Sequence, residues 1–340
     1  MNRPIRIAVV GPGLVAQRFH LPAYVASDEV EVAALVSDRV EAARAVAARF
    51  GNPPVLASIE EVLADPAIDA VDICTPNALH APMAIAAARA GKHVLVEKPM
   101  ATRLEDADAM IAAARSAGVV LMVAHNLRYA PIFETMERIV REGTLGRLLA
   151  VRGVMMHAGP DEAWGSDSAW FWQAAQAGGG ALLDLGIHMI DLVRWLVGRP
   201  VVAVAAMMAR TLKPTPFDDN ALALLRFEGD VLASVQASWT ARPRGDRQLV
   251  VQGEHGQLVM DAGAPQPLTL HLRAENGTRT VVPEVPAQSL RGNPYVHFAR
   301  AIKTGEPPLT TGEEGRASLA VTLAAYEAAR SSRTIEGRWG

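Results

Sequence analysis

Lys98 stands in the sequence Glu97-Lys98-Pro99, directly after an apolar run, and its side chain is suited to moving a proton. A charged pair at the end of a buried strand is unusual unless a ligand uses it. A lysine ammonium there can donate or accept the proton of a substrate hydroxyl. The alternative is a salt bridge on the surface, which is common and contributes little to stability.

Asp184 and His188 form a second candidate group, because residues four apart share one face of a helix. The rest of this helix is apolar, so the two titratable groups must be paired or functional, since burying them unpaired is costly. An imidazole can shuttle a proton and a carboxylate can orient a hydroxyl. An aspartate that caps the helix and a histidine in the core are an equally good alternative. Two such ligands make a poor zinc set, so we expect no metal.

A glycine-rich turn, Gly11-Pro12-Gly13, lies between the first apolar run and a helical pattern. Gly11 allows a tight turn, and Gly13 lets the backbone approach a pyrophosphate, whose charge the N-terminus of the next helix attracts. Leu14 and Val15 open that helix. A glycine-proline turn without a ligand is the alternative, but the strand–turn–helix context favours a dinucleotide site.

Asp38 follows the second apolar run, about 20 residues beyond the glycines, where an acidic side chain can bind the adenosine ribose and disfavour a 2′-phosphate. This position favours NAD as the cofactor. The neighbouring Arg39 leaves NADP open, because a guanidinium can stack on adenine or pair with a 2′-phosphate. A solvated pair of loop residues is the alternative.

Two more segments follow apolar runs and are expected at the same ligand, because loops at the carboxyl ends of parallel strands line the crevice. In the segment Thr75-Pro76-Asn77, Asn77 can bond the cofactor or cap a helix, and the nearby His80 is expected to pack rather than to catalyse. The second segment is Glu97-Lys98. The residues expected at the cofactor are Gly11, Gly13, Leu14, Val15, Asp38, Arg39, Thr75, Pro76, Asn77, His80, Glu97 and Lys98.

The elements that must position these residues alternate between short apolar runs and helical patterns up to about residue 124. The runs are apolar throughout, so we expect helices on both faces of a parallel, doubly wound sheet. Later strand-like runs have no helices between them, and Asn276-Gly277 is a hairpin signal. We predict an α/β Rossmann domain over residues 1–124. An α+β domain with a large open, mostly antiparallel sheet is predicted over residues 125–340.

The composition is that of a globular protein: 340 residues, half of them hydrophobic, with a formal net charge of −3. Binding to nucleic acid is not expected, because it needs clustered lysine and arginine. Membrane insertion is not expected either, since no run approaches the ~20 apolar residues of a span. The single cysteine, Cys74, excludes an internal disulfide and fits a cytoplasmic protein.

Taken together, these motifs resemble the glucose–fructose oxidoreductase / inositol dehydrogenase (Gfo/Idh/MocA) family over nearly the whole chain. The segments that carry the resemblance are Gly11-Pro12-Gly13, Thr75-Pro76-Asn77, Glu97-Lys98-Pro99, Asp184 with His188, Gly305-Glu306-Pro307-Pro308 and Thr311-Gly312-Glu313-Glu314-Gly315. The resemblance implies that Lys98 transfers a proton, and that Asp184 and His188 bind or deprotonate the substrate hydroxyl.

The resemblance also implies contacts with substrate and with other copies of the chain. Asn126, Arg128 and Tyr129 match a segment that often lines the site. Trp170 lies where a substrate loop is expected, and aromatic faces suit sugar rings, although these residues also suit a core or an interface. The open sheet of the family often mediates assembly, so we expect a homodimer or homotetramer.

The predicted function is that of an NAD(P)-dependent dehydrogenase acting on CH–OH groups. It would transfer a hydride between nicotinamide and a hydroxyl-bearing carbon of a sugar, an inositol or other polyol, or a sugar acid. A non-catalytic NAD(P)-binding regulator of the same fold is the main alternative, and a redox-assisted lyase or glycosidase is a further one. The presence of Lys98, Asp184 and His188 together favours the enzyme over a sensor.

Overall fold

The computed structural model describes residues 3–340, which divide into two compact units. The first extends to His125 and also contains Arg291–Arg316; the second comprises Asn126–Leu290 and Ala317–Gly340. This division differs from a linear boundary at residue 124, because a late segment returns to the first unit. There Tyr295 stacks on His20, with ring centroids 3.9 Å apart.

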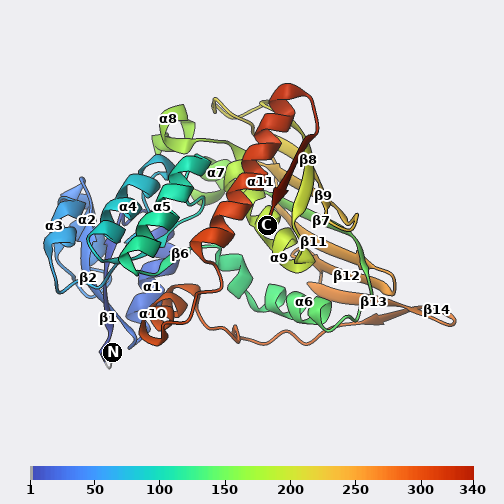
Figure 1. Ribbon diagram of the computed structural model, residues 1–340, viewed down its shortest axis with the longest axis horizontal. Helices are drawn as coiled ribbons and strands as arrows, with labels where there is room; N and C mark the ends of the chain where they lie inside the picture. Colours follow the sequence, from blue (N-terminus) through green and yellow to red (C-terminus); the bar gives the residue numbers. More distant parts are fainter. Residues whose placement is uncertain (1–2) are drawn as a thin grey trace. The chain divides into compact units, whose positions relative to one another are not determined.

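The first unit is built on a six-stranded parallel sheet with the order β3-β2-β1-β4-β5-β6 (Figure 1). Its strands are β1 (Ile5–Val10), β2 (Val30–Val36), β3 (Val55–Leu56), β4 (Ala70–Ile73), β5 (His93–Val96) and β6 (Leu121–Val123). The strand order reverses between β1 and β4, which is where doubly wound sheets bind ligands at their carboxyl ends. The predicted Rossmann fold is confirmed.

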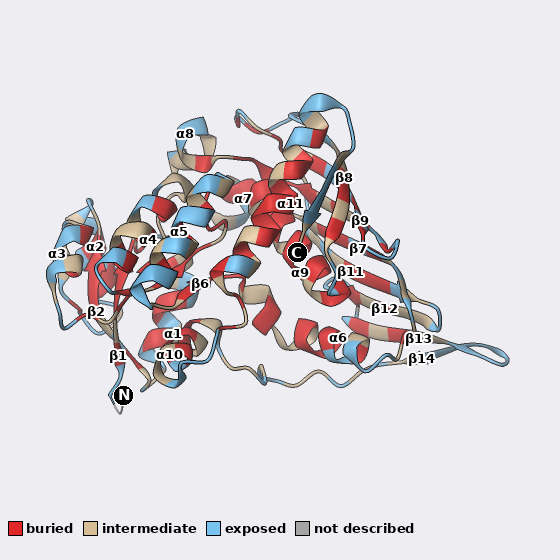
Figure 2. Ribbon diagram, viewed as in Figure 1, coloured by how far each residue is buried: buried red, intermediate tan, exposed pale blue. Residues whose placement is uncertain are grey.

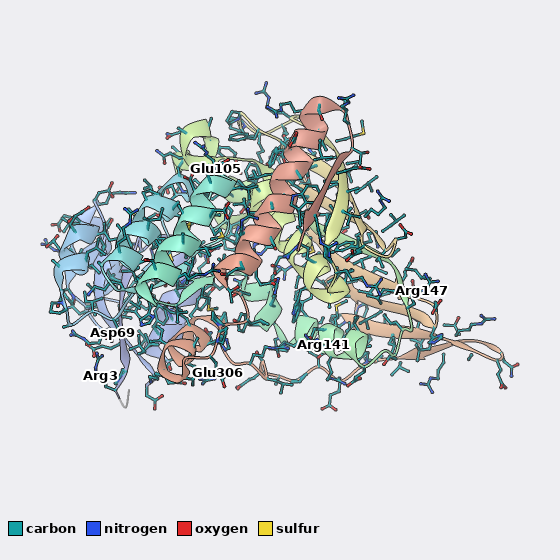
Figure 3. All side chains as sticks on the ribbon, viewed as in Figure 1. Arg3, Asp69, Glu105, Arg141, Arg147 and Glu306 are labelled. Atoms are coloured by element: carbon teal, nitrogen blue, oxygen red, sulfur yellow. The ribbon has the colours of Figure 1, made fainter. Side chains whose placement is uncertain are left out.

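Every residue of β4 is buried, as in a sheet with helices on both faces. The helices of this unit are α1 (Leu21–Val25), α2 (Val40–Ala47), α3 (Ile59–Ala64), α4 (His80–Arg89), α5 (Leu104–Ala117) and α10 (Pro294–Thr304). A π-helical turn, Ala16–His20, leads into α1. At the amino ends of the two central strands Arg3 pairs with Asp69 at 2.6 Å, which holds the start of β1 beside the start of β4 (Figure 3).

The second unit is built on a nine-stranded sheet with the order β14-β13-β12-β11-β7-β10-β9-β8-β15. Its strands are β7 (Leu148–Met156), β8 (Val201–Ala209), β9 (Asn220–Phe227), β10 (Leu232–Ser238), β11 (Asp246–Gly253), β12 (Gly256–Asp261), β13 (Leu268–Ala274), β14 (Gly277–Val281) and β15 (Ile335–Trp339). The pair β7–β10 is parallel and the other pairs are antiparallel. The predicted class of sheet is therefore confirmed, including the hairpin at Asn276.

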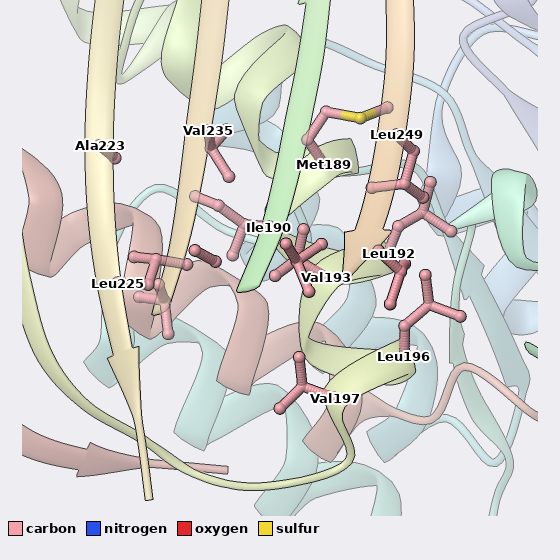
Figure 4. Packing of buried hydrophobic residues seen from close by; sticks show 14 of the residues in the cluster. Met189, Ile190, Leu192, Val193, Leu196, Val197, Ala223, Leu225, Val235 and Leu249 are labelled. Carbon is pink, nitrogen blue, oxygen red and sulfur yellow. The ribbon is translucent and has the colours of Figure 1, made fainter. Parts of the chain in front are cut away.

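One face of this large sheet carries the core of the second unit. The helical segments of this unit are Asn126–Tyr129, α6 (Pro131–Arg141), α7 (Gly159–Trp164), Ala169–Trp172, α8 (Ala174–Ala177), Leu182–Gly186, α9 (Ile187–Val197) and the later part of α11 (Gly312–Ser331). Figure 4 shows α9 packed on the sheet through Met189, Ile190, Leu192, Val193, Leu196 and Val197, which face Ala223, Leu225, Val235 and Leu249.

The opposite face of the sheet is left open. Burial alternates along β9, so that the residues between the buried ones are exposed (Figure 2). Met207 on β8, Leu222 and Leu224 on β9, and Leu232 on β10 are each more than half exposed. Within residues 3–340, no helix is long and apolar enough to cross a membrane.

Candidate active site

The glycine turn has the geometry that a dinucleotide requires. Gly11 adopts φ +80°, and a Cβ there would lie 2.9 Å from the carbonyl oxygen of Cys74. Gly13 is different: a Cβ there would find no atom closer than 4.0 Å, so the space in front of its backbone is open. Gly11 is thus needed for the turn itself, and Gly13 leaves room for a ligand against the main chain.

Leu14 and Val15 open the helical segment that leaves this turn. The segment is anchored by Ala16, which is fully buried, and by a bond from the Gln17 N–H to the carbonyl oxygen of Gly13 at 3.0 Å. The N-terminus of a helix attracts phosphate, because its first N–H groups have no partners within the helix.

Asp38 and Arg39 are both exposed and lie just beyond the end of β2. The Gly11 N–H donates to the carbonyl oxygen of Val36 at 2.9 Å, so this strand end is held against the glycine turn. An exposed carboxylate here is free to move onto a ribose, as predicted for NAD binding.

The segment from Thr75 to Asn77 also reaches the glycine turn, since the Thr75 Cγ2 lies 3.0 Å from the position of a Gly11 Cβ. His80 is buried and connects two loops: its Nδ1 lies 2.8 Å from the Pro99 carbonyl oxygen and its Nε2 lies 2.8 Å from that of Thr75. Burial lowers the pKa of His80. These contacts support packing as its main role.

A buried polar cluster includes Glu97, whose side chain accepts the main-chain N–H of Lys98. No sequence motif indicated the other members of this cluster. His20 is placed between the carboxylates of Asp72 and Glu97, with Nδ1–Oδ2 and Nε2–Oε1 distances of 2.7 and 3.0 Å. The other Glu97 oxygen accepts the Lys98 N–H at 3.0 Å. His20, Asp72 and Cys74 could be considered as metal ligands, but the 2.7 Å spacing is that of a hydrogen bond.

In the second unit, Asp184 and His188 are the half-buried positions in a run of buried residues over 181–190. Asp184 Oδ2 accepts a hydrogen bond from the Trp239 indole N–H at 3.0 Å. Trp239 lies just after β10 and is itself buried. It was not predicted as a site residue, because the two partners are 55 positions apart in the chain.

Aromatic rings gather around this aspartate. Trp170 stacks on Phe171 with centroids 3.8 Å apart, and Phe171 and Trp172 meet the Trp239 ring edge to face at 6.4 and 5.9 Å. The segment Ala169–Trp172 is thereby fixed on the residue that holds Asp184. The structure thus brings Trp170 into one cluster with Asp184 in the second unit.

The segment from Asn126 to Tyr129 follows a different pattern. Arg128 is buried and forms a two-pronged ion pair with Asp191, at 2.8 and 2.7 Å. Ser318 also donates to Asp191, at 2.9 Å. Tyr129 is buried and Asn126 is half-buried. The ion pair gives Arg128 a structural role, and contact of these three residues with substrate stays a prediction.

Comparison with known proteins identifies the class. Residues 5–125 match the family described as "Oxidoreductase family, NAD-binding Rossmann fold", and residues 133–259 match the "GFO/IDH/MocA C-terminal domain". A 1,5-anhydro-D-fructose reductase of Ensifer adhaerens is 34% identical, over 97% of this chain and 98% of its own. A myo-inositol 2-dehydrogenase of Thermotoga maritima is 26% identical over 98% of each chain.

Solved structures agree with this assignment. A levoglucosan dehydrogenase in complex with NADH and levoglucosan has a TM-score of 0.87 at 28% identity, over 98% of this chain and 99% of that one. The protein is therefore an NAD(P)-dependent oxidoreductase acting on CH–OH groups, whose first unit is an NAD-binding Rossmann domain. It belongs to the Gfo/Idh/MocA family, as the sequence motifs indicated.

Proposed function

We propose that this protein oxidises one secondary alcohol of a cyclic sugar, polyol or sugar acid, or catalyses the reverse reduction. In this proposal Lys98 and His188 handle the proton, and Asp184 orients the hydroxyl. The observation that carries it is the placement of Asp184: a half-buried carboxylate beside an aromatic cluster, directed by a hydrogen bond from Trp239. Such a carboxylate can accept a hydrogen bond from a hydroxyl.

The residues proposed to hold NAD are those around the glycine turn. Leu14 and Val15 would present backbone N–H groups to the pyrophosphate, and the open space before Gly13 would let it approach the main chain. The Gly13 N–H itself donates to the Gly11 carbonyl oxygen at 2.7 Å and shapes the turn. Asp38 would bind the ribose and disfavour a 2′-phosphate, with Arg39 beside the adenine. When bound, NAD supplies the hydride acceptor at its nicotinamide ring.

The remaining cofactor contacts are assigned to the loops after β4 and β5. Thr75, Pro76 and Asn77 would line the crevice at the switch point between β1 and β4. Glu97 holds the backbone N–H of Lys98, so the lysine starts from a fixed main chain. A fixed starting point matters because proton transfer depends on placing donor and acceptor within hydrogen-bond reach.

The substrate class follows from the aromatic cluster and from relatives. Trp170 and its neighbours offer ring faces of the kind that pack against the C–H face of a sugar. Relatives named as reductases or dehydrogenases of 1,5-anhydro-D-fructose, levoglucosan, D-apiose and myo-inositol support a sugar or inositol substrate. Asn126, Arg128 and Tyr129 are proposed as further contacts with it.

The test is a screen of levoglucosan, inositols, aldoses, sugar acids and 1,5-anhydrofructose with NAD⁺, NADP⁺ and their reduced forms, following the reduced-nicotinamide absorbance. We expect turnover of at least one compound, with a preference for NAD. Lys98→Met should keep NAD affinity and lose turnover. Thermal stabilisation by NAD without turnover of any compound would favour the non-catalytic regulator instead.

We also propose that the open face of the large sheet joins copies of the chain into a dimer or tetramer. Met207, Leu222, Leu224 and Leu232 are exposed on neighbouring strands of this sheet, and exposed apolar side chains that adjoin one another are typical of interfaces between proteins. In light scattering, Leu224→Glu should give a smaller species than the unmodified protein. Leu212→Glu is the control, since Leu212 is similarly exposed but lies outside the strands. A cytoplasmic location stays a prediction.

A further inference from the structure

We propose that His20 is a positioning residue whose imidazolium links Asp72 to Glu97 and thereby fixes the main chain that carries Lys98. The inference rests on the proposed role of Lys98 in proton transfer. The cluster consists of His20, Asp72 and Glu97, all of which belong to the first unit. No step of the reaction requires His20 to touch the substrate or the cofactor.

The hydrogen-bond count identifies the charge state of the cluster. Both ring nitrogens of His20 face carboxylate oxygens, at 2.7 Å for Asp72 and 3.0 Å for Glu97. Asp72 Oδ2 also accepts the Tyr24 hydroxyl at 2.8 Å, and Glu97 Oε2 accepts the Lys98 N–H. Asp72 Oδ2 already accepts the Tyr24 hydroxyl and so accepts from Nδ1 as well, and an ionised Glu97 accepts from Nε2 through Oε1. With both carboxylates ionised, both imidazole nitrogens carry protons.

The electrostatics of the surroundings agree with that count. Burial is the largest influence on His20 and opposes its charging, but the charge interactions around the ring, led by that with Asp72, together outweigh it. The pKa of His20 is therefore raised well above 6.5. Burial raises the pKa of Glu97 and the hydrogen bond from His20 lowers it, and the net result is a lowered pKa. The other groups that face the imidazole are Cys74 and the stacked ring of Tyr295, while the Tyr24 hydroxyl donates to Asp72.

The connection to Lys98 runs through a single carboxylate. One oxygen of Glu97 is held by the ring of His20 and the other by the main-chain N–H of Lys98. His20 belongs to the helical segment that leaves the glycine turn, and Asp72 belongs to β4. The cluster therefore joins the cofactor-binding segment, the central strand and the Lys98 turn around the switch point of the sheet.

A purely stabilising role explains this cluster less well. His20 and Asp72 are fully buried and Glu97 is 8% exposed. Buried ion clusters are often replaceable by apolar side chains with no loss of stability, because desolvation offsets the attraction between the charges. What apolar side chains cannot supply is a carboxylate oxygen held in place to accept the main-chain N–H of Lys98.

The first test compares His20→Gln with Tyr24→Phe. Glutamine cannot reproduce the imidazolium, because both of its N–H donors are on one nitrogen and its other polar atom is an acceptor. Tyr24→Phe removes a donor to Asp72 and leaves the His20–Glu97 contact in place. We expect at least a tenfold loss of kcat in His20→Gln, with the Kd for NAD⁺ within about twofold of the unmodified protein. Tyr24→Phe should lower the melting temperature and keep kcat.

Equal kcat values in His20→Gln and Tyr24→Phe would overturn the inference. Lys98→Met separates this failure from that of the proposed function. If Lys98→Met keeps turnover, the role of Lys98 is wrong. If Lys98→Met loses turnover while His20→Gln keeps it, the role of Lys98 stands and only the proposed positioning by His20 is wrong.

A second measurement needs no stable variant of His20. In protein labelled with ¹⁵N at histidine, the ring nitrogens of His20 should both still report the protonated imidazolium at a pH at which an ordinary histidine is neutral. The Tyr24→Phe protein should show the same signals. A neutral ring with one protonated nitrogen near pH 7 would overturn the inference.

Discussion

The glycine turn offers a sharp test, because its two glycines are required for different reasons. Gly11→Ala would force a side chain into φ +80° and place its Cβ 2.9 Å from the carbonyl oxygen of Cys74. Gly13→Ala would place its Cβ no closer than 4.0 Å to any atom, at a φ that any residue adopts. The first substitution should therefore damage the fold, and the second should damage only the binding of NAD.

The magnitudes follow from these contacts. A left-handed conformation costs a non-glycine residue about 1–2 kcal/mol. Crowding against a rigid backbone adds about 1–3 kcal/mol, so Gly11→Ala should lose roughly 3 kcal/mol. For a cooperative unit of this size that is a fall of roughly 6–12 °C in melting temperature. Gly13→Ala should melt within about 2 °C of the unmodified protein, since a new methyl group in open space adds no strain.

The assay is thermal unfolding with and without NAD⁺, together with calorimetric titration of NAD⁺. Gly13→Ala should bind NAD⁺ at least tenfold more weakly, because its methyl group occupies the space through which a pyrophosphate approaches the main chain. Unchanged NAD⁺ affinity in Gly13→Ala would refute the assignment of this turn to the cofactor. Unchanged melting of Gly11→Ala would refute the steric reasoning.

Three further predictions concern the remaining site and the second core. Trp239→Phe removes the donor to Asp184, so kcat/KM should fall about tenfold or more with unchanged NAD⁺ affinity, as steady-state kinetics can measure. Asp38→Ala should raise the affinity for NADP⁺ relative to NAD⁺ about tenfold in titrations, and an unchanged ratio would contradict the ribose contact. Asp191→Asn removes the carboxylate that pairs with the buried guanidinium of Arg128, so urea unfolding should show a loss of about 3–5 kcal/mol.

The first unit could be predicted from sequence because its signals are local. Each strand from β1 to β6, apart from the two-residue β3, is a short and mostly apolar run, and the glycine turn follows β1 directly. The return of Arg291–Arg316 to this unit could not be predicted in the same way. It depends on packing between residues far apart in the chain, such as Tyr295 on His20.

The second unit shows the same limit more clearly. Strand β7 was not predicted, because Arg152 and Gly153 interrupt its apolar run. In the structure Gly153 allows α9 to approach, since a Cβ there would lie 3.1 Å from the Cβ of Met189. The spacing of Asp184 and His188 was visible in the sequence, whereas the contact of Asp184 with Trp239 was not.

Asp72 is a residue from which the sequence alone could have predicted a buried polar cluster. A carboxylate stands in the middle of a buried parallel strand, where an unpaired charge would be too costly, so a buried partner had to exist. The identity of that partner, His20, becomes visible only when β4 and the helical segment after the glycine turn come together in the fold.

The most direct test of the proposed reaction is one comparison of the unmodified protein with Lys98→Met. For both proteins the Kd for NAD⁺ would be measured first, and then the rate of NADH formation with the best substrate of the screen. We predict equal Kd values and a rate in Lys98→Met reduced by at least about a hundredfold, the lower range for loss of a general acid–base group. Equal rates in the two proteins would contradict the proposed role of Lys98.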